Sequence, residues 1–137
     1  MPTFEIHLTT KGPNDVVVIS EQVAEKIHDS GVQEGIGLVF NPGATGAITT
    51  IEPERGAVND FRRLLEQLVP QNADYEHNLA YGDGNGFSHV RAALIGPSLS
   101  FPIVDGKPVL GRWQDIIFVE CDNRPRDRHI VLNVVEG

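Results

Sequence analysis

The residues best suited to chemistry lie within forty positions, from Tyr75 to Gln114. His77 and His89 are separated by eleven residues in a polar segment that glycines interrupt, and Asn85 lies between them. A buried packing role for two imidazole rings is hard to arrange in such a segment, because each ring carries nitrogens that need hydrogen-bond partners. We therefore interpret the segment as a polar loop that carries a small-molecule or metal site.

The two histidines allow three interpretations. Neutral imidazole binds zinc or another divalent metal at about 2.0–2.1 Å, so His77 and His89 could share one ion, with Asp83, Asn85, Glu52 or water as further ligands. Because histidine titrates near neutrality, the same rings could instead carry a proton to or from a reacting group. In the third interpretation, each ring only caps nearby backbone groups. The spacing alone does not separate the three.

Two other stretches could hold an anion. The turn at residues 42–50 places small residues and hydroxyls between two expected strands, where backbone amides could bind an anion, although a hairpin turn is the plainer interpretation. It lacks the Lys-Ser/Thr ending of a P-loop, which argues against a nucleoside triphosphatase. Arg128 closes an arginine-rich run at residues 122–128, which is either a solvated turn or a phosphate contact, since guanidinium matches phosphate in shape.

Ser98, Trp113 and Gln114 are further candidates. Ser98 follows a Gly-Pro pair and could present its hydroxyl to a ligand or simply begin a strand. No G-x-S-x-G elbow surrounds it, which disfavours nucleophilic hydrolase chemistry. Trp113 and Gln114 are an adjacent aromatic and amide pair, and core packing is the ordinary role of a tryptophan.

The composition limits the class of partner. A chain of 137 residues fits one domain, residues 1–137, with enough apolar surface to fold without disulfides or a structural metal. Its net charge of −8 opposes binding to a nucleic acid. A small phosphate-bearing ligand remains compatible, because a few local donors can hold it whatever the overall charge.

The cysteine count and the hydropathy indicate the compartment. Cys121 is the single cysteine, so no internal disulfide is possible and a reducing, cytoplasmic setting is favoured. No segment approaches the roughly 20 apolar residues needed to cross a bilayer, and the first ten residues lack the features of a signal peptide. We expect no membrane partner.

Hydrophobic periodicity predicts the elements that must position these residues. Helices are expected over residues 20–29 (capped by Ser20 and stopped by Gly31), from about Val58 to Pro70, and from Ser88 onward with Val90, Ala93 and Leu94 as the apolar side. Strands are expected over residues 4–8, 16–19, 36–40, 47–51, 99–103, 108–110, 116–121 and 130–135, the first and second pairs each forming a hairpin and Asp105-Gly106 a tight turn.

This order of elements predicts a fold class of α+β: a single small domain with a largely antiparallel sheet and three short helices. Strands and helices do not alternate regularly enough for a doubly wound parallel sheet. With few helices to cover several apolar strands, we expect a second subunit to cover one sheet face.

Several strings resemble one known family, the YjbQ-like family, which is also described as secondary thiamine-phosphate synthases. The resemblance covers nearly the whole chain and is carried by Gly43–Glu52, Tyr75–His77, Asn85–His89, Leu94–Ser98, Pro102–Gly106 and the Leu-Gly-x-Trp-Gln string at Leu110–Gln114. Two positions depart from the family pattern. Arg112 stands where members commonly have Thr, and Phe40-Asn41-Pro42 replaces a histidine pair.

The resemblance implies a YjbQ-like trimer with pockets where subunits meet, and a weak activity that joins a pyrimidine diphosphate to a thiazole phosphate with release of pyrophosphate. It implies a phosphorylated small molecule as partner and a divalent metal, zinc or magnesium, as possible cofactor. The implied catalytic residues are His77, His89, Asn85 and Glu52, the first two also as metal ligands; the implied ligand- and phosphate-binding residues are Thr49, Ser98, Trp113, Gln114, Glu120 and Arg128. Two alternatives stay open: a non-catalytic module that binds a phosphorylated metabolite or a metal, and a metal-dependent phosphatase or hydrolase.

Overall fold

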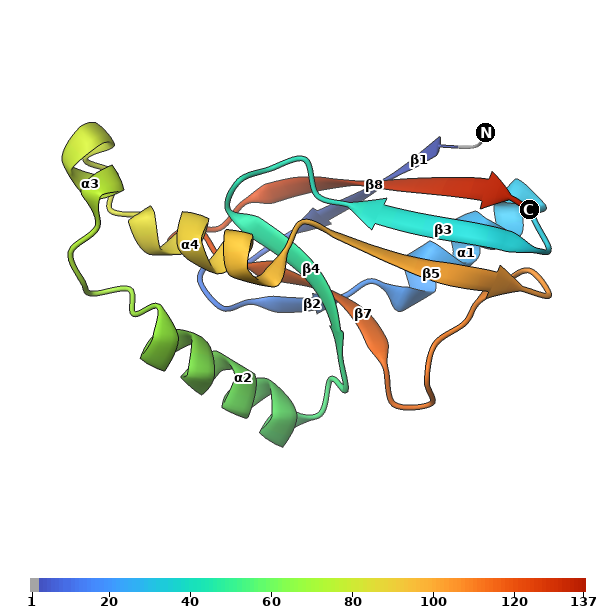
Figure 1. Ribbon diagram of the computed structural model, residues 1–137, viewed down its shortest axis with the longest axis horizontal. Helices are drawn as coiled ribbons and strands as arrows, with labels where there is room; N and C mark the ends of the chain where they lie inside the picture. Colours follow the sequence, from blue (N-terminus) through green and yellow to red (C-terminus); the bar gives the residue numbers. More distant parts are fainter. Residues whose placement is uncertain (1–2) are drawn as a thin grey trace.

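The computed structural model describes residues 3–137 as two antiparallel sheets and four helices (Figure 1). One sheet has the strand order β1-β8-β3-β5-β6 and the other the order β2-β7-β4. The elements are β1 (Thr3–Thr9), β2 (Val16–Val18), α1 (Ser20–Ser30), β3 (Gly35–Phe40), β4 (Gly46–Ile51), α2 (Arg55–Leu68), α3 (Glu76–Tyr81), α4 (Gly86–Ile95), β5 (Ser98–Val104), β6 (Lys107–Pro108), β7 (Asp115–Glu120) and β8 (Asp127–Glu136). The α+β class and the antiparallel sheet are as the sequence predicted.

Two apolar clusters hold the layers together. The larger cluster joins the inner face of the five-stranded sheet to α1 and to β7, with Ile27, Phe118 and Leu132 among its fully buried members. The smaller cluster covers the other face of the three-stranded sheet with α2 and α4, through Leu65 and Ala92. β7 is therefore buried on both faces, which explains why Ile116–Glu120 reads as a nearly continuous apolar run instead of alternating.

Both predicted hairpins at the start of the chain are wrong. β1 pairs with β8, and β2 pairs with β7 in the other sheet. Likewise β3 pairs with β5 and β8, whereas β4 pairs with β7. Alternation identifies a strand but not its partner, and the segments at residues 10–15 and 41–45 cross between sheets instead of turning back.

The helix boundaries differ from the prediction in instructive ways. α2 begins at Arg55, before the expected start near Val58, because the Glu54 carboxylate accepts hydrogen bonds from the amides of Gly56 and Ala57 and so caps the helix earlier. Ser20 was expected to cap α1, but it is the first helical residue, and its Oγ instead accepts a hydrogen bond from the amide of Ile116 at 2.8 Å.

The short helix near residue 90 was predicted with the wrong face inward. α4 begins at Gly86, and Phe87, Ser88, Arg91 and Ala92 are buried, while Val90, Ala93 and Leu94 are exposed. The predicted apolar side failed because an arginine and a serine occupy the core side. A fourth helix, α3, was not predicted: the polar composition of residues 76–81 concealed it.

Arg91 fixes α4 against its neighbours and explains its buried side. Its Nε donates to the carbonyl of Val69 at 2.9 Å, Nη1 to Asn14 Oδ1 at 2.6 Å, and Nη2 to Glu66 Oε2 at 2.8 Å. The guanidinium also lies over the ring of Phe87. One fully buried side chain thus ties α4 to α2 and to the turn before β2.

Other predictions of turns are confirmed. Gly31 ends α1 with φ of 74°. Asp105 and Gly106 have φ of 53° and 74° and connect β5 to β6, as a tight Asp-Gly turn requires.

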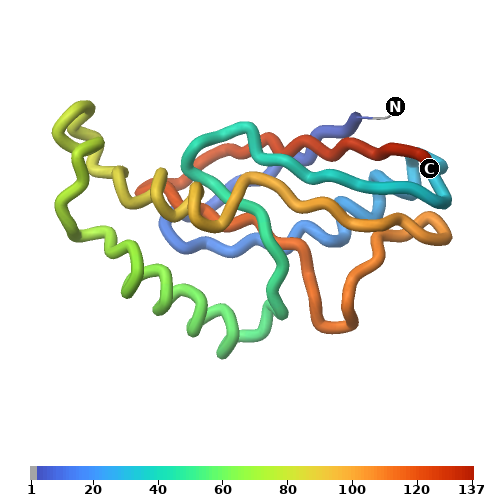
Figure 2. The backbone as a smooth tube through the Cα atoms, viewed as in Figure 1, coloured from blue at the N-terminus to red at the C-terminus, as the bar shows by residue number. Residues whose placement is uncertain are grey.

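The outer face of the five-stranded sheet has no covering element in residues 3–137. Ile36, Leu38 and Phe40 project from β3 with 57%, 39% and 40% exposure, and Val135 on β8 is also exposed. The backbone trace shows the excursion through α2, α3 and α4 beside the three-stranded sheet (Figure 2). The prediction that a second subunit covers one sheet face remains open. None of the helices in this part of the chain is long and apolar enough to cross a bilayer.

Candidate functional site

A cavity of about 450 Å³ opens where both sheets meet the junction of α3 and α4. Three segments that are distant in the sequence enclose it: the loop before β4, the stretch from α3 to the first turn of α4, and the run before and into β8. Its lining residues are Pro42, Gly43, Ala44, Thr45, His77, Tyr81, Asp83, Asn85, His89, Asp122, Arg124, Arg126 and Arg128.

The two histidines meet in this cavity. Their ring centroids are 4.3 Å apart, with ring planes tilted by 53°. His77 lies in α3 and not in a loop as predicted, whereas His89 lies in the first turn of α4 as expected. The side-chain oxygen of Asn78 accepts a hydrogen bond from the amide of Gly86 at 2.8 Å, which joins the two helices and brings the rings together.

Asn85 lies between two carboxylates and can donate to only one side at a time. In one orientation its amide nitrogen donates to Asp122 Oδ1 at 3.3 Å. In the other, the nitrogen donates to Asp83 Oδ1 at 2.9 Å and to His77 Nε2 at 3.0 Å, which are shorter contacts. In either orientation the amide oxygen faces the opposite carboxylate. Asn85 therefore links the Asp83 and His77 side of the cavity to Asp122.

Arg128 and Glu120 form a buried ion pair behind the cavity wall, with 6% and 0% exposure. Arg128 Nε donates to Glu120 Oε1 at 2.9 Å, and Nη2 donates to Glu120 Oε2 and to Thr45 Oγ1. Nη1 has no hydrogen-bond partner among residues 3–137, yet it is not sealed from solvent. It lies beside Gly43, where an added Cβ would come within 3.2 Å of it.

Asp122 and Thr45 were not singled out by the sequence. Asp122 is 1% exposed and accepts hydrogen bonds from the amide of Asn123 at 2.7 Å and from Thr45 Oγ1 at 3.1 Å. Burial raises the pKa of this carboxyl, but these bonds, the Asn85 amide and the guanidinium of Arg126 outweigh it, so the net pKa is below its ordinary value. An isolated aspartate in a charged run looks solvated in sequence, which is why it was missed.

Other predicted site residues lie elsewhere in the same chain. Thr49, Glu52, Trp113 and Gln114 gather near the far end of β4 and β7, where Gln114 Nε2 lies 3.4 Å from Thr50 Oγ1. Trp113 is 63% exposed, and the guanidinium of Arg112 lies 4.9 Å from its ring centroid, so the tryptophan does not belong to the core. Ser98 is exposed at the start of β5, opposite Phe40. Within one chain none of these five residues lines the histidine cavity.

A metal fits this cavity only as an open site. Among residues 3–137 no group of three His, Cys, Asp or Glu side chains is placed to hold an ion. His77 Nε2 lies 3.5 Å from Asp83 Oδ1, and when Asn85 donates to Asp122 its amide oxygen joins these two in a mixed nitrogen and oxygen set. Such a set suits a divalent ion that keeps waters or takes oxygens from a ligand, and not a closed structural ion.

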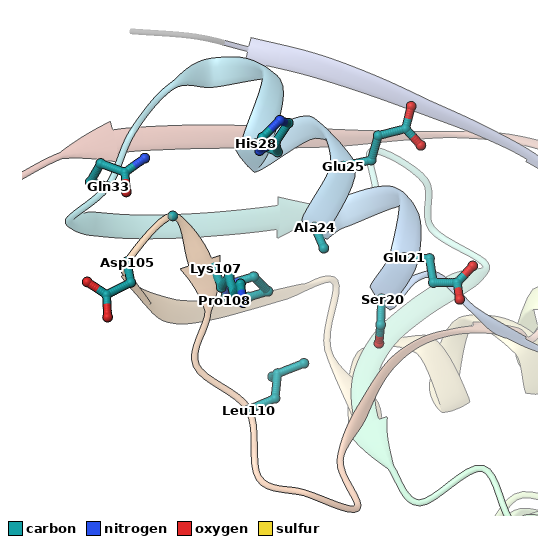
Figure 3. A pocket seen from close by; sticks show the side chains of 11 residues that line it. Ser20, Glu21, Ala24, Glu25, His28, Gln33, Asp105, Lys107, Pro108 and Leu110 are labelled. Atoms are coloured by element: carbon teal, nitrogen blue, oxygen red, sulfur yellow. The ribbon is translucent and has the colours of Figure 1, made fainter.

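A larger cavity, of about 770 Å³, lies between α1 and the β5-β6 hairpin (Figure 3). Glu21, Glu25 and Asp105 stand at its rim, while Ala24 and Leu110 line its apolar part. It lacks the paired imidazoles and the arginine cluster of the smaller cavity. We therefore place the candidate site at the histidine cavity despite its smaller volume.

Comparison with known proteins identifies relatives over almost the whole chain. The family profile described as "UPF0047 protein YjbQ-like" matches residues 4–137. A UPF0047 protein of Methanothermobacter thermautotrophicus is 38% identical over 132 residues, which are 96% of this chain and 90% of that protein. The UPF0047 protein YugU of Bacillus subtilis is 28% identical and covers 98% of each chain.

Solved structures agree with this assignment. A hypothetical protein from Aeropyrum pernix K1 superposes with a TM-score of 0.91 at 29% identity and covers 100% of both chains. A protein of unknown function from Sulfolobus solfataricus P2 superposes with a TM-score of 0.89 at 30% identity, over 99% of both chains.

Proposed function

This chain belongs to the UPF0047 protein YjbQ-like family, and from that premise we propose that its histidine cavity binds a phosphorylated small molecule and acts on it as an enzyme. The observation that carries the proposal is the guanidinium of Arg128. Two of its nitrogens are held by Glu120 and Thr45, and the third lies beside Gly43 at the cavity wall, with no partner among residues 3–137. A guanidinium fixed by buried partners is preorganised, so it loses little freedom when it binds a phosphate oxygen.

The local charge supports an anionic ligand even though the chain as a whole is acidic. Arg124, Arg126 and Arg128 line the cavity together with Asp83 and Asp122. Arg128 is paired with Glu120 and Arg126 with Asp122, whereas Arg124 has no ion-pair partner among residues 3–137 and is available to an anion. Gly43 and Ala44 add a stretch of small residues at the wall where a phosphate group can approach the backbone.

Thiamine-phosphate synthesis is the named reaction that we propose for this site. In it, a diphosphate leaves as pyrophosphate while a pyrimidine is joined to a thiazole phosphate, so the main task is to neutralise charge on the leaving group. Arg128 would hold phosphate oxygens, and His77 and His89 would carry protons or bind a divalent ion. A zinc or magnesium ion held by the two histidines would add positive charge at those oxygens.

We also propose that the protein is a cytoplasmic homotrimer. The support is the uncovered apolar face of β3, where Ile36, Leu38 and Phe40 project together. We propose that the distant candidates Thr49, Glu52, Ser98, Trp113 and Gln114 contribute to a pocket shared between subunits, as the family resemblance implies.

Calorimetric binding of inorganic pyrophosphate tests the anion site. We expect Arg128→Lys to weaken binding by about tenfold or more, because one charge-assisted hydrogen bond is worth about 1.5–3 kcal/mol. Arg63→Lys is the matched control, since Arg63 pairs only with Asp60 on the exposed side of α2. Equal pyrophosphate affinity in wild type and Arg128→Lys would overturn the proposal.

A synthesis assay with both phosphorylated precursors then tests catalysis. We expect product with wild type, and loss of product with His77→Ala and His89→Ala at unchanged oligomer size. Ligand binding without any product would instead identify a binding module, and phosphate release without synthesis would identify a phosphatase.

A further inference from the structure

We infer that a second, apolar cavity beside the histidine cavity holds the non-phosphorylated part of the ligand, and that this part is a compact uncharged ring. The inference rests on the proposed phosphate site and deepens it. This apolar annex has a volume of about 280 Å³ and is lined by Gly43, Ala44, Gly46, His89, Ala92, Ala93 and Pro97.

The annex and the histidine cavity adjoin each other. Gly43, Ala44 and His89 line both, so one ligand can reach from the arginines past the imidazole into the annex. The unpartnered Nη1 of Arg128 lies at this shared wall, beside Gly43. A phosphate bound there would direct its substituent toward the annex.

Small residues on two facing elements create the space. Gly46 begins β4 at a position where an added Cβ would collide with the ring of Phe118, so no side chain is tolerated at this part of the annex wall. Across from it, α4 contributes Ala92 and Ala93, whose methyl groups do not fill the gap. Larger side chains at these positions would close the annex.

The lining determines the chemical class of the group. Apart from His89 at the boundary, the annex offers no charged or amide side chain and no hydroxyl. A polyhydroxylated sugar would lose hydrogen bonds to water there without replacement, at a cost for each unpaired group. An apolar cavity of about 150 Å³ is already large enough for benzene, so the annex can take one ring. The preferred ligands are therefore phosphate esters of compact rings.

Comparison of the affinities of two simple phosphate esters tests this inference in the wild-type protein. Calorimetry with benzyl phosphate, glycerol phosphate and inorganic phosphate gives three dissociation constants. We expect benzyl phosphate to bind about 10–100 times more tightly than glycerol phosphate, as burial of a ring predicts. In Ala93→Leu, whose side chain fills the annex, the ratio of the two ester affinities should fall to near one.

Val90→Leu is the control, since this exposed position on the same helix does not line either cavity. Its ester affinity ratio should equal that of wild type. If wild type binds inorganic phosphate through Arg128 but shows no preference between the esters, the annex is wrong and the phosphate site stands. If wild type binds none of the three, the proposed function fails and the annex fails with it. The wild-type comparison decides even if Ala93→Leu does not fold.

Discussion

Arg128→Met separates the stability of the buried ion pair from its role in binding. The variant leaves the Glu120 carboxylate fully buried with two remaining donors, Thr10 Oγ1 at 2.7 Å and the amide of Asp122 at 3.0 Å. Removing one partner of a buried pair costs about 3–5 kcal/mol, because the other charge stays uncompensated. We expect the free energy of unfolding to fall by that amount.

The Glu120→Met variant should lower the free energy of unfolding by less than Arg128→Met does. In Glu120→Met, Arg128 keeps the carbonyl and hydroxyl of Thr45, and its Nη1 can be hydrated from the cavity. The double variant with Met at both positions should recover most of the loss, since apolar side chains of similar volume often replace a buried pair without cost. Neither Arg128 variant should bind pyrophosphate.

Urea unfolding followed by far-ultraviolet circular dichroism measures these effects, because Trp113 is too exposed to serve as a core fluorescence probe. With an m value of about 2 kcal/mol/M, a loss of about 4 kcal/mol shifts the midpoint by about 2 M urea. Protein concentration is kept constant, because the apparent stability of an oligomer depends on it. A double variant as unstable as Arg128→Met would refute the reasoning, because the uncompensated charge could not then be the cause.

Four further outcomes follow from the structure. Arg91→Met should lower the free energy of unfolding by about 3 kcal/mol in the same urea assay, because the buried carbonyl of Val69 and the partly exposed acceptors on Asn14 and Glu66 lose their donor; a change below about 1 kcal/mol would contradict this. Asp122 stabilises the fold through its ionised form, since its pKa is lowered in the folded protein. That stabilisation is present above the ordinary pKa of 3.8 and is lost as the pH falls through the lower folded pKa. The urea midpoint of Asp122→Asn should therefore change less with falling pH than the midpoint of wild type. If the wild-type protein has the mass of the proposed trimer in light scattering, Leu38→Asp should reduce that mass toward a monomer, whereas an unchanged mass would place the subunit contact elsewhere. Burial raises the pKa of the Cys121 thiol to about 12, so a disulfide reagent at pH 8 should react fully only after urea is added; rapid reaction of the folded protein would show that the thiol is accessible.

The sequence predicted elements better than pairings. Period-two alternation located β1 and the end of β8, but nothing in it indicated that they are neighbours across more than a hundred residues. The same limit affected α4, where Val90 and Leu94 looked like the inward side. Tertiary contacts of Arg91 decided that side, and an arginine gives no inward signal in a helical pattern.

For the candidate site as well, the sequence predicted residue types better than tertiary contacts. Residue type and the family resemblance both selected a set that lines one cavity in the structure: His77, Asn85, His89 and Arg128. Asp122 was missed because an aspartate in a charged run looks solvated, and its burial depends on contacts with Thr45 and Asn85, which are distant in the sequence. The resemblance also grouped residues that lie away from the histidine cavity within one chain, such as Trp113 and Gln114. A sequence motif does not tell whether its residues act in the same chain or in a neighbouring one.

The central position of β8 has a consequence for how the protein is made. β8 lies between β1 and β3 and supplies hydrogen bonds to both, although it is formed by residues 127–136. At about 5–20 residues per second, a ribosome needs roughly 6–24 s to pass from β1 to β8, and β1 has no strand partner during that time. A nascent chain stalled just after Cys121 would already carry both histidines, but it would lack β8 and the three arginines that line the cavity. The histidine cavity would thus be completed last in synthesis, while the apolar strands stay unpaired and accessible to a chaperone.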